Sequence, residues 1–450
     1  MEPLPQSVVG AVLTEAPAVP APPSPVAPAV PLGLLRRWAG ILSAYLSTQV
    51  LTQLAGIAAG LLLVRSMPVP EFALYTLGAS VITSFTFLCD LGSTSSLLYF
   101  FQRTAKSGEA FHPYLRAVLS LRRIAFLLGT AGVILVFPRS ASAKGFGGMS
   151  VTLVTAGIVL AVWCQITASV RVLALRLAGR YGSSYRAELV GGGLRLLLAG
   201  VMVVTALLHA WIAMLSTALG TAAVALLATP RDGERTEIHL GPYRRQILRY
   251  ILPSLPSALY FSIQGTLVIW LTATFGSGRN IAEVGALSRL GLAVGLFSGL
   301  TGVVFLPRMA QIIDERLYRR RYFQYGGLLL GIALALFATA WAVPRLFLLV
   351  LGQHYTGLHR ELLLVVAGSG VNLIGGYAVA VNLARSWNRF EWLAVAVLIL
   401  AQAALVATLP LGTTAGALLF NLLSAVVGLG LQLTITAFGF FRPRVVQWMG

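Results

Sequence analysis

Twelve long apolar stretches fill almost the whole of this 450-residue chain, and arginines are concentrated in every second gap between them. A helix needs roughly 20 apolar residues to cross a hydrocarbon core of about 30 Å, because it rises about 1.5 Å per residue. A chain that is 57% hydrophobic and 10% charged would also be poorly soluble in water. These features predict an all-α polytopic membrane protein.

The apolar stretches predict 12 transmembrane helices in two pseudo-symmetric six-helix bundles. The predicted helices are residues 38–64, 72–101, 117–137, 149–170, 186–208, 210–229, 250–275, 281–306, 323–350, 361–384, 391–409 and 413–440. Nine of the 21 prolines fall in residues 1–33, which predicts a disordered cytoplasmic tail. The chain then divides into a first bundle (34–229), a cytoplasmic linker (230–249) and a second bundle with a short cytoplasmic tail (250–450).

The positions of the basic residues predict the orientation. If the N-terminus is inside, the cytoplasmic segments hold 25 of the 33 Lys and Arg. Cytoplasmic loops of membrane proteins carry an excess of Lys and Arg, so both termini are predicted to be cytoplasmic. The basic inner face suits the anionic lipids of the cytoplasmic leaflet, which are therefore expected partners. Because the net charge of +19 follows the loops of a membrane protein, we expect no nucleic-acid partner.

The sequence lacks the motifs that are typical of several function classes. The five histidines form no HxxxH or HExxH pattern, and Cys89 and Cys164 both fall within predicted helices. The chain contains no GxxxxGK[ST] phosphate loop, and its loops are too short for a folded catalytic domain. We therefore expect no metal site, no cofactor and no enzyme activity.

A weak internal repeat relates the two halves. Residues 70–75 (PEFALY) open the second predicted helix, and residues 282–287 (AEVGAL) open the eighth, 212 positions later. Parallel repeats of this kind place a substrate path between the two halves. The repeat therefore predicts a transporter with its substrate cavity between the bundles.

Charged groups within membrane helices are costly unless they face water or a partner, so they indicate candidate sites. Arg289 and Arg195 are predicted to line the cavity, with a structural ion pair or snorkelling to the surface as the alternatives for each. In the cavity, the guanidinium group of Arg289 would bind an anion such as phosphate through paired donors. Asp90 lies near the inner end of the second helix and suits either coupling to an ion or structural pairing. Polar residues extend the predicted cavity wall, and an interhelical hydrogen bond is the alternative for each: Gln49, Gln53, Gln264 and Asn372.

Motifs along residues 38–440 resemble the polysaccharide-exporting flippases of the oligosaccharide flippase family. The similar segments are residues 61–65, 70–75, 90–92, 252–256, 284–290, 305–307 and 382–389. That family belongs to the multidrug/oligosaccharidyl-lipid/polysaccharide exporter (MOP) superfamily. The resemblance implies that Arg65, Glu71, Asp90 and Arg289 occupy recurrent charged positions, with Arg65 in the substrate cavity and Glu71 in ion coupling or a structural role.

The resemblance implies a flippase of the bacterial cytoplasmic membrane that moves an undecaprenyl-diphosphate-linked oligosaccharide to the outer leaflet by alternating access. The expected partners are the lipid-linked oligosaccharide, a coupling cation and polysaccharide polymerase or assembly proteins. A multidrug exporter and a peptidoglycan-precursor exporter of the same superfamily remain alternatives. A membrane-embedded polyprenyl-sugar transferase and a scaffold of an assembly complex are alternatives from other classes.

Overall fold

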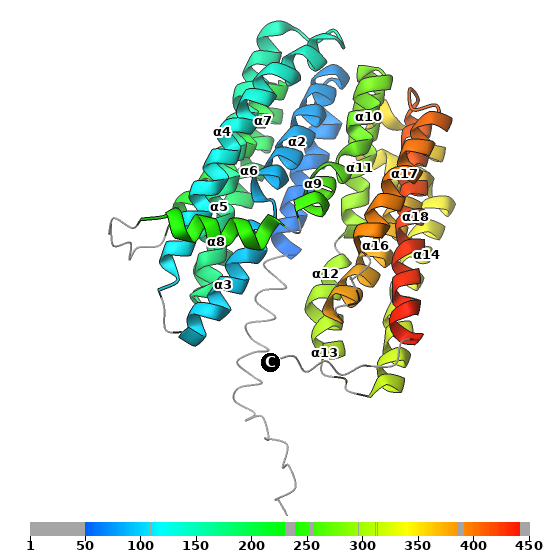
Figure 1. Cartoon of the computed structure of the whole chain (residues 1–450). Coiled ribbons are helices and arrows are strands. Elements are labelled where there is room, and N and C mark those ends of the chain that lie inside the picture. Colours follow the sequence, from blue (N-terminus) through cyan, green and yellow to red (C-terminus); the bar gives the residue numbers. More distant parts are fainter. Residues whose placement is uncertain are drawn as a thin grey trace, which may run out of the picture. The chain divides into compact units, whose positions relative to one another are not determined.

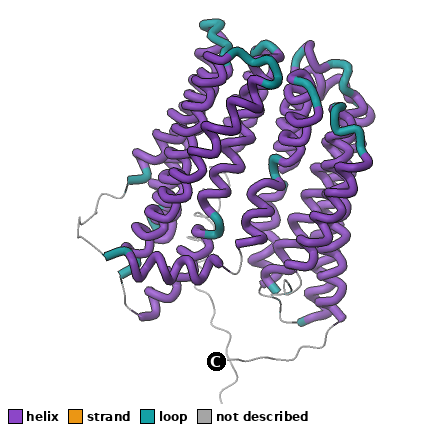
Figure 2. Tube along the Cα trace, turned by 45° about the horizontal axis from the view of Figure 1, so that its top comes forward, coloured by secondary structure: helices purple, strands orange, loops and turns teal. Residues whose placement is uncertain are grey.

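A computed structural model describes most of the chain after the first 49 residues. The described residues are 50–107, 110–229, 239–252, 255–295, 297–310, 312, 314–385, 387 and 391–441. The predicted tail (1–33) and Gln49 lie outside the described residues. The described part of the chain is helical and contains no strand (Figure 2).

The helices pack in two groups (Figure 1). The first group starts with the helix Val50–Ser66. It continues with α2 (Val69–Asp90), α3 (Ser93–Ser107), α4 (His112–Ser142), α5 (Gly148–Leu177), α6 (Tyr181–Val204) and α7 (Ala210–Leu227). The second group contains α9 (Leu255–Gln264), α10 (Leu267–Phe275), α11 (Gly278–Gly295), α12 (Ser298–Leu300), α13 (Leu306–Ala310), α14 (Glu315–Ala342), α15 (Pro344–Leu351), α16 (His359–Ala384), α17 (Glu391–Thr408) and α18 (Thr414–Phe441).

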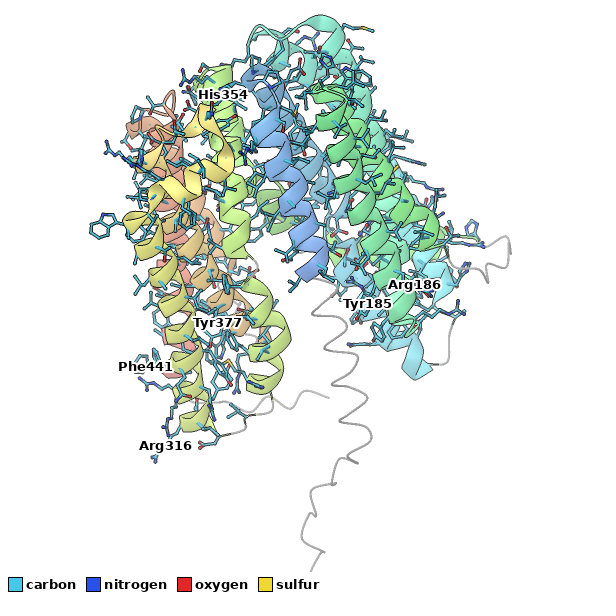
Figure 3. All side chains as sticks on the ribbon, turned by 180° about the vertical axis from the view of Figure 1, so that it is seen from behind. Tyr185, Arg186, Arg316, His354, Tyr377 and Phe441 are labelled. Atoms are coloured by element: carbon cyan, nitrogen blue, oxygen red, sulfur yellow. The ribbon has the colours of Figure 1, made fainter. Side chains whose placement is uncertain are left out.

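The helices confirm the predicted membrane fold. Among the described residues, nine helices are long and apolar enough to cross a membrane, and the bent pair α9–α10 makes a tenth. The helix Val50–Ser66 and the interrupted run from α11 to α13 occupy the two remaining predicted spans. Figure 3 places Arg186 and Arg316 toward one end of the helices and His354 at the opposite end, in agreement with the predicted sidedness of these loops.

Four predicted spans are interrupted rather than continuous: the second, the seventh, the eighth and the ninth. The second span breaks between α2 and α3, where Leu91 (φ 40°) and Gly92 (φ 83°) adopt left-handed conformations. The seventh span bends by 59° between α9 and α10. The eighth span leaves the α-helix after Gly295 and contains a π-helical turn at Thr301–Phe305. Helix breaks of this kind are tolerated inside a membrane when neighbouring groups satisfy the freed backbone.

The linker contains a helix that the sequence analysis missed. Residues 239–240 lead into α8 (Gly241–Ile251), which lies crosswise to α4 and α5 in Figure 1. A second short helix, α15, begins at Pro344 soon after α14 and ends at Leu351, before Gly352, whose φ of 99° favours glycine. The prediction of residues 323–350 as one helix was therefore wrong at its end.

The two groups meet along α2, which contacts α9, α10 and α11. Gly285 of α11 lies against Thr76 of α2, so closely that a Cβ atom at Gly285 would overlap the threonine side chain. Small residues allow helices to approach in this way inside a membrane. The two segments that carry the sequence repeat, at the starts of α2 and α11, therefore belong to the helices that join the halves.

Candidate functional site

A cavity of about 360 Å³ lies among helices of the first group. The helix Val50–Ser66, α3, α5, α6 and α7 line it. Its polar lining residues are Thr52, Thr94, Gln165, Ser169, Arg176, Glu188, Arg195 and Thr221. The sequence predicted a substrate cavity between the two bundles, whereas this cavity belongs to the first.

Arg195 lines the cavity with most of its donors unpaired among the described residues. Among the described residues, its guanidinium group donates one hydrogen bond, from an Nη atom to Thr221 Oγ1 at 3.3 Å. The buried Nε atom has no hydrogen-bond partner. An unsatisfied donor beside a cavity can bind an acceptor supplied by a ligand, and a charged donor binds an anion most strongly.

Glycines bring α6 and α7 together around Arg195. A Cβ atom at Gly191 would overlap Val224 and lie 2.7 Å from the carbonyl oxygen of Gly220. A Cβ atom at Gly220 would lie 2.9 Å from the carbonyl oxygen of Gly191 and 3.3 Å from Cβ of Arg195. The close approach of the two backbones therefore fixes the position from which Arg195 enters the cavity.

A second arginine of the cavity is paired. Arg176 at the end of α5 donates to both carboxylate oxygens of Glu188 on α6 at 2.8 Å, and to Ser184 Oγ at 3.1 Å. The short turn between α5 and α6 contains Gly179 at φ 72°, which places the two helix ends side by side. Two guanidinium groups therefore face one carboxylate, and the charged lining of the cavity is net positive.

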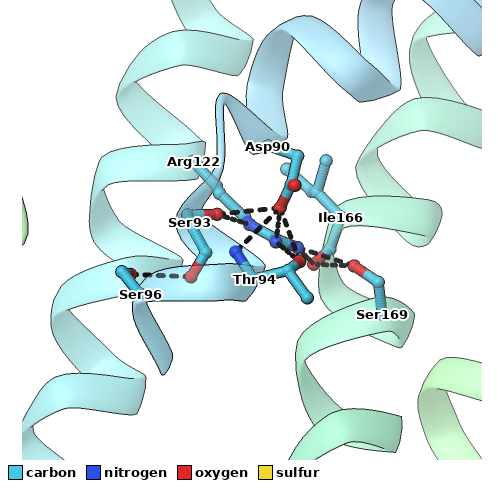
Figure 4. A network of polar contacts seen from close by, with 7 residues as sticks. All are labelled: Asp90, Ser93, Thr94, Ser96, Arg122, Ile166 and Ser169. Carbon is cyan, nitrogen blue, oxygen red and sulfur yellow. Dashed lines mark hydrogen bonds and ion pairs between the residues drawn. The ribbon is translucent and has the colours of Figure 1, made fainter. Parts of the chain in front are cut away.

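A buried network closes the cavity on the side of α4. Arg122 is 3% exposed and pairs with Asp90, the last residue of α2 (Figure 4). Its other donors bond to Ser93 Oγ at 2.7 Å, Thr94 Oγ1 at 2.8 Å and Ser169 Oγ at 2.7 Å. Thr94 and Ser169 also line the cavity, so the network shares two residues with its wall.

Asp90 is thus held in a structural pair. Its Oδ1 accepts hydrogen bonds from Ser93 Oγ, from Thr94 Oγ1 and from the backbone N–H of Thr94. These bonds satisfy the first turn of α3 immediately after the break at Leu91 and Gly92. Of the two predicted roles of Asp90, the contacts match structural pairing; ion coupling stays a prediction.

Arg289 lies where the two groups of helices meet. Its Cζ atom is 5.7 Å from the ring centre of Tyr75 on α2, a cation–π distance. A side chain at Gly60 would lie 3.2 Å from Cδ of Arg289, so the glycine leaves room for the arginine. Arg195 lines the cavity of the first group, whereas Arg289 lies against Tyr75 and Gly60 and does not line that cavity. Of the two predicted arginines, the structure therefore places Arg195 in the cavity wall.

Three other predicted residues lie elsewhere. Arg65 is exposed at the end of the helix Val50–Ser66 and packs beside Gly352. Glu71 accepts a hydrogen bond from the first N–H of α7, at Ala210, at 2.6 Å, and so caps that helix. Gln264 lies at the bend before α10, and its buried Oε1 has no partner among the described residues.

Gln53 and Asn372 are both exposed, Gln53 on the helix Val50–Ser66 and Asn372 on α16. Neither residue lines the cavity in the first group. Because Gln49 is outside the described residues, the predicted pair of Gln49 and Gln53 stays a prediction.

Sequence analysis missed the residues that build the wall around Arg195. Arg176 and Arg122 were assigned to cytoplasmic segments, but α4 begins at His112 and α5 continues to Leu177, so both lie within helices. The turn residues Ala178, Gly179 and Arg180 could have indicated the pairing of Arg176 with Glu188. The pairing of Arg122 with Asp90 left no local pattern, because 32 positions separate the two residues.

Known structures share the arrangement of these helices. Lipid II flippase MurJ in an inward closed conformation superposes with a TM-score of 0.68 at 11% identity, over 87% of this chain and 86% of that chain. An inward-facing multidrug resistance transporter of the MATE family of the MOP superfamily superposes with a TM-score of 0.59 at 18% identity, over 87% and 96%. The chain therefore shares the fold of these two proteins. No protein-family model and no curated protein matches the sequence.

Proposed function

We propose that this protein exports an anionic lipid, an undecaprenyl-diphosphate-linked oligosaccharide, from the inner to the outer leaflet of a bacterial cytoplasmic membrane. The observation that carries the proposal is the guanidinium group of Arg195, which lines the cavity and donates one hydrogen bond among the described residues. A diphosphate cannot enter hydrocarbon without partners, because the desolvation of a charge is costly. Two arginines at membrane depth supply those partners.

The cavity fits part of such a substrate. Its volume of about 360 Å³ is near the lower end of the range of roughly 300–1,000 Å³ for small-molecule sites. Arg195 brings a guanidinium group to the cavity wall, while threonine, serine and glutamine side chains supply groups that suit sugar hydroxyls. The polyprenyl chain would stay in lipid, and alternation between inward- and outward-open states would carry the headgroup across.

The charge of the cavity argues for an anion over a cationic drug. The acid of the cavity, Glu188, is engaged by Arg176 at 2.8 Å. A cation would therefore have to displace an existing ion pair and approach Arg195. A peptidoglycan precursor has the same diphosphate chemistry, and the structural likeness to a lipid II flippase favours it as the second candidate.

The proposal is tested in proteoliposomes that contain the full chain and a fluorescent undecaprenyl-diphosphate oligosaccharide. Transfer between leaflets is followed with a membrane-impermeant quencher. Loss of a hydrogen bond to a charged group costs about 1.5–3 kcal/mol. We therefore expect Arg195→Gln and Arg289→Gln each to slow transfer about tenfold or more.

The matched control is Arg139→Gln, which removes an exposed arginine at the outer end of α4 and should leave transfer unchanged. A lipid II analogue in the same vesicles distinguishes the two anionic candidates by their rates. Transport of a cationic dye without transfer of either lipid would refute the proposal, as would normal transfer by both arginine variants.

A further inference from the structure

The helix α8 presents a basic and apolar surface that the transport site does not use. α8 contains three arginines and the residues Ile247, Leu248 and Ile251, with no Asp or Glu. It lies crosswise to α4 and α5 (Figure 1), whereas the membrane-spanning helices run along them. A helix of this composition lying across the ends of membrane spans is suited to the plane of the lipid headgroups.

One side of α8 is fixed to the first group of helices. Ile247 and Ile251 are buried against Leu97 and Phe100 of α3 and the side chains of α4. Tyr243 contacts Tyr114 edge to face, with ring centres 5.0 Å apart, and Arg244 bonds to Ser120. These contacts hold α8 in a defined position, so its opposite side is equally defined.

The opposite side carries two arginines beside two large apolar side chains. Arg245 and Arg249 are exposed and lie one helical turn apart. Leu248 and Leu252, at the C-terminal end of α8, are 52% and 65% exposed. Tyr250 stacks on Tyr99 of α3 at 4.8 Å, and both rings are partly exposed. Tyrosine is enriched where membrane proteins cross the headgroup region.

Among the described residues, the three helices that form this surface carry only basic charge. α3, α4 and α8 contain no Asp or Glu, while exposed Arg103 and Arg123 add positive charge on α3 and α4. Arginine presents paired donors to a phosphate group, and exposed leucines beside it would otherwise contact water. An acidic phospholipid suits both features, because one molecule supplies a phosphate for the arginines and acyl chains that cover the leucines.

We propose that Arg245, Leu248, Arg249 and Leu252 of α8 form a binding site for an acidic phospholipid of the inner leaflet. The phosphate lies between Arg245 and Arg249, and the acyl chains cover Leu248 and Leu252. Because α8 ends just before α9, the first part of the bent seventh span, the bound lipid anchors the start of the second bundle. This site is separate from the cavity of Arg195 and does not depend on the transported substrate.

The test is native mass spectrometry of the full chain titrated with phosphatidylglycerol or with phosphatidylcholine of the same acyl chains. Each arginine near an anionic lipid contributes about fivefold in affinity. We expect Arg245→Gln/Arg249→Gln to weaken the first phosphatidylglycerol adduct about 25-fold, with little change for phosphatidylcholine. Arg245→Lys/Arg249→Lys, which keeps the charge, should retain most of the affinity.

The matched control is Arg316→Gln/Arg320→Gln, two exposed arginines with the same spacing on α14, beside Asp314 and Glu315. This pair should change the first adduct little. Leu248→Ser/Leu252→Ser should also weaken it, and inorganic phosphate should not displace the lipid. Equal affinity in the α8 and α14 glutamine variants would overturn the proposal, and so would displacement of the lipid by inorganic phosphate.

Discussion

Arg122 and Arg195 are arginines of the same bundle, but their surroundings differ sharply. Arg122 is 3% exposed and bonds to an aspartate, three hydroxyl groups and a backbone carbonyl. Among the described residues, Arg195 bonds to one hydroxyl group, and its buried Nε has no hydrogen-bond partner. A satisfied guanidinium group holds helices together, whereas an incompletely satisfied one is available to a ligand.

The largest expected effect is the loss of the satisfied arginine. Arg122→Ala leaves Asp90 and three hydroxyl groups without their donor. Removing one partner of a buried ion pair typically costs about 3–5 kcal/mol. The free energy of unfolding should fall by that amount, measured by thermal unfolding of the purified protein, and the yield of folded protein should fall with it.

The double variant Asp90→Leu/Arg122→Leu is the control for this prediction. Replacing a whole buried pair with apolar residues often restores stability, so the double variant should be more stable than Arg122→Ala. Arg195→Ala should cost much less than Arg122→Ala. Equal losses in the two single variants would break the comparison.

A smaller loss of stability, together with a loss of transport, is expected when a glycine that sets the position of Arg195 is replaced. Gly191→Ala places a Cβ atom against Val224 and 2.7 Å from the carbonyl oxygen of Gly220. Such overpacking costs about 1–3 kcal/mol, and the displaced α6 should carry Arg195 away from its site. Gly193→Ala is the matched control, because a Cβ atom at Gly193 has open space. The control should keep both stability and transport in the same proteoliposome assay.

The smallest effect tests whether an unpartnered polar atom by itself marks a functional site. The hydroxyl of Tyr355 is buried without a hydrogen-bond partner among the described residues, but Tyr355 does not line the cavity. Removal of such a group is close to neutral or stabilising. Tyr355→Phe should therefore preserve transport and raise the unfolding midpoint slightly; a loss of transport would contradict this.

The buried hydroxyl of Tyr355 also makes the stability of the protein depend on pH. Burial, followed by the nearby charge of Glu283, raises the pKa of Tyr355 from 10.0 to about 12. Between these values the unfolded chain releases a proton that the folded chain keeps, so stability falls as the pH rises. Tyr355→Phe should reduce this fall, as a comparison of thermal unfolding at about pH 9 and pH 11 would show.

The sequence predicted the spans better than the site, for physical reasons. Membrane length and apolar composition determine the spans locally, whereas the break after Asp90 lies inside a stretch that was predicted as one helix. The partner of a buried arginine depends on tertiary packing, so the pairs of Arg122 with Asp90 and of Arg176 with Glu188 could not be identified from local patterns. Arg195 and Arg289 were identified because a charge within an apolar span is unusual by itself.

α8 escaped prediction because its apolar residues are too few for a membrane span. Its sequence, GPYRRQILRYI, has Ile247 and Ile251 four positions apart, the spacing of one helical face. Its three arginines, Arg244, Arg245 and Arg249, made the segment resemble a charged loop. The four-residue spacing of its apolar residues, which places them on one face of a helix, is therefore the signal that identifies α8.

The central claim is that Arg195 remains incompletely satisfied in order to bind an anionic headgroup. The most direct measurement is the affinity of the purified full chain for a short-chain polyprenyl-diphosphate sugar, compared among wild type, Arg195→Gln and Arg139→Gln. The account predicts that Arg195→Gln binds about tenfold more weakly or worse, while Arg139→Gln binds as the wild type does. Equal affinity of the wild type and Arg195→Gln would contradict it.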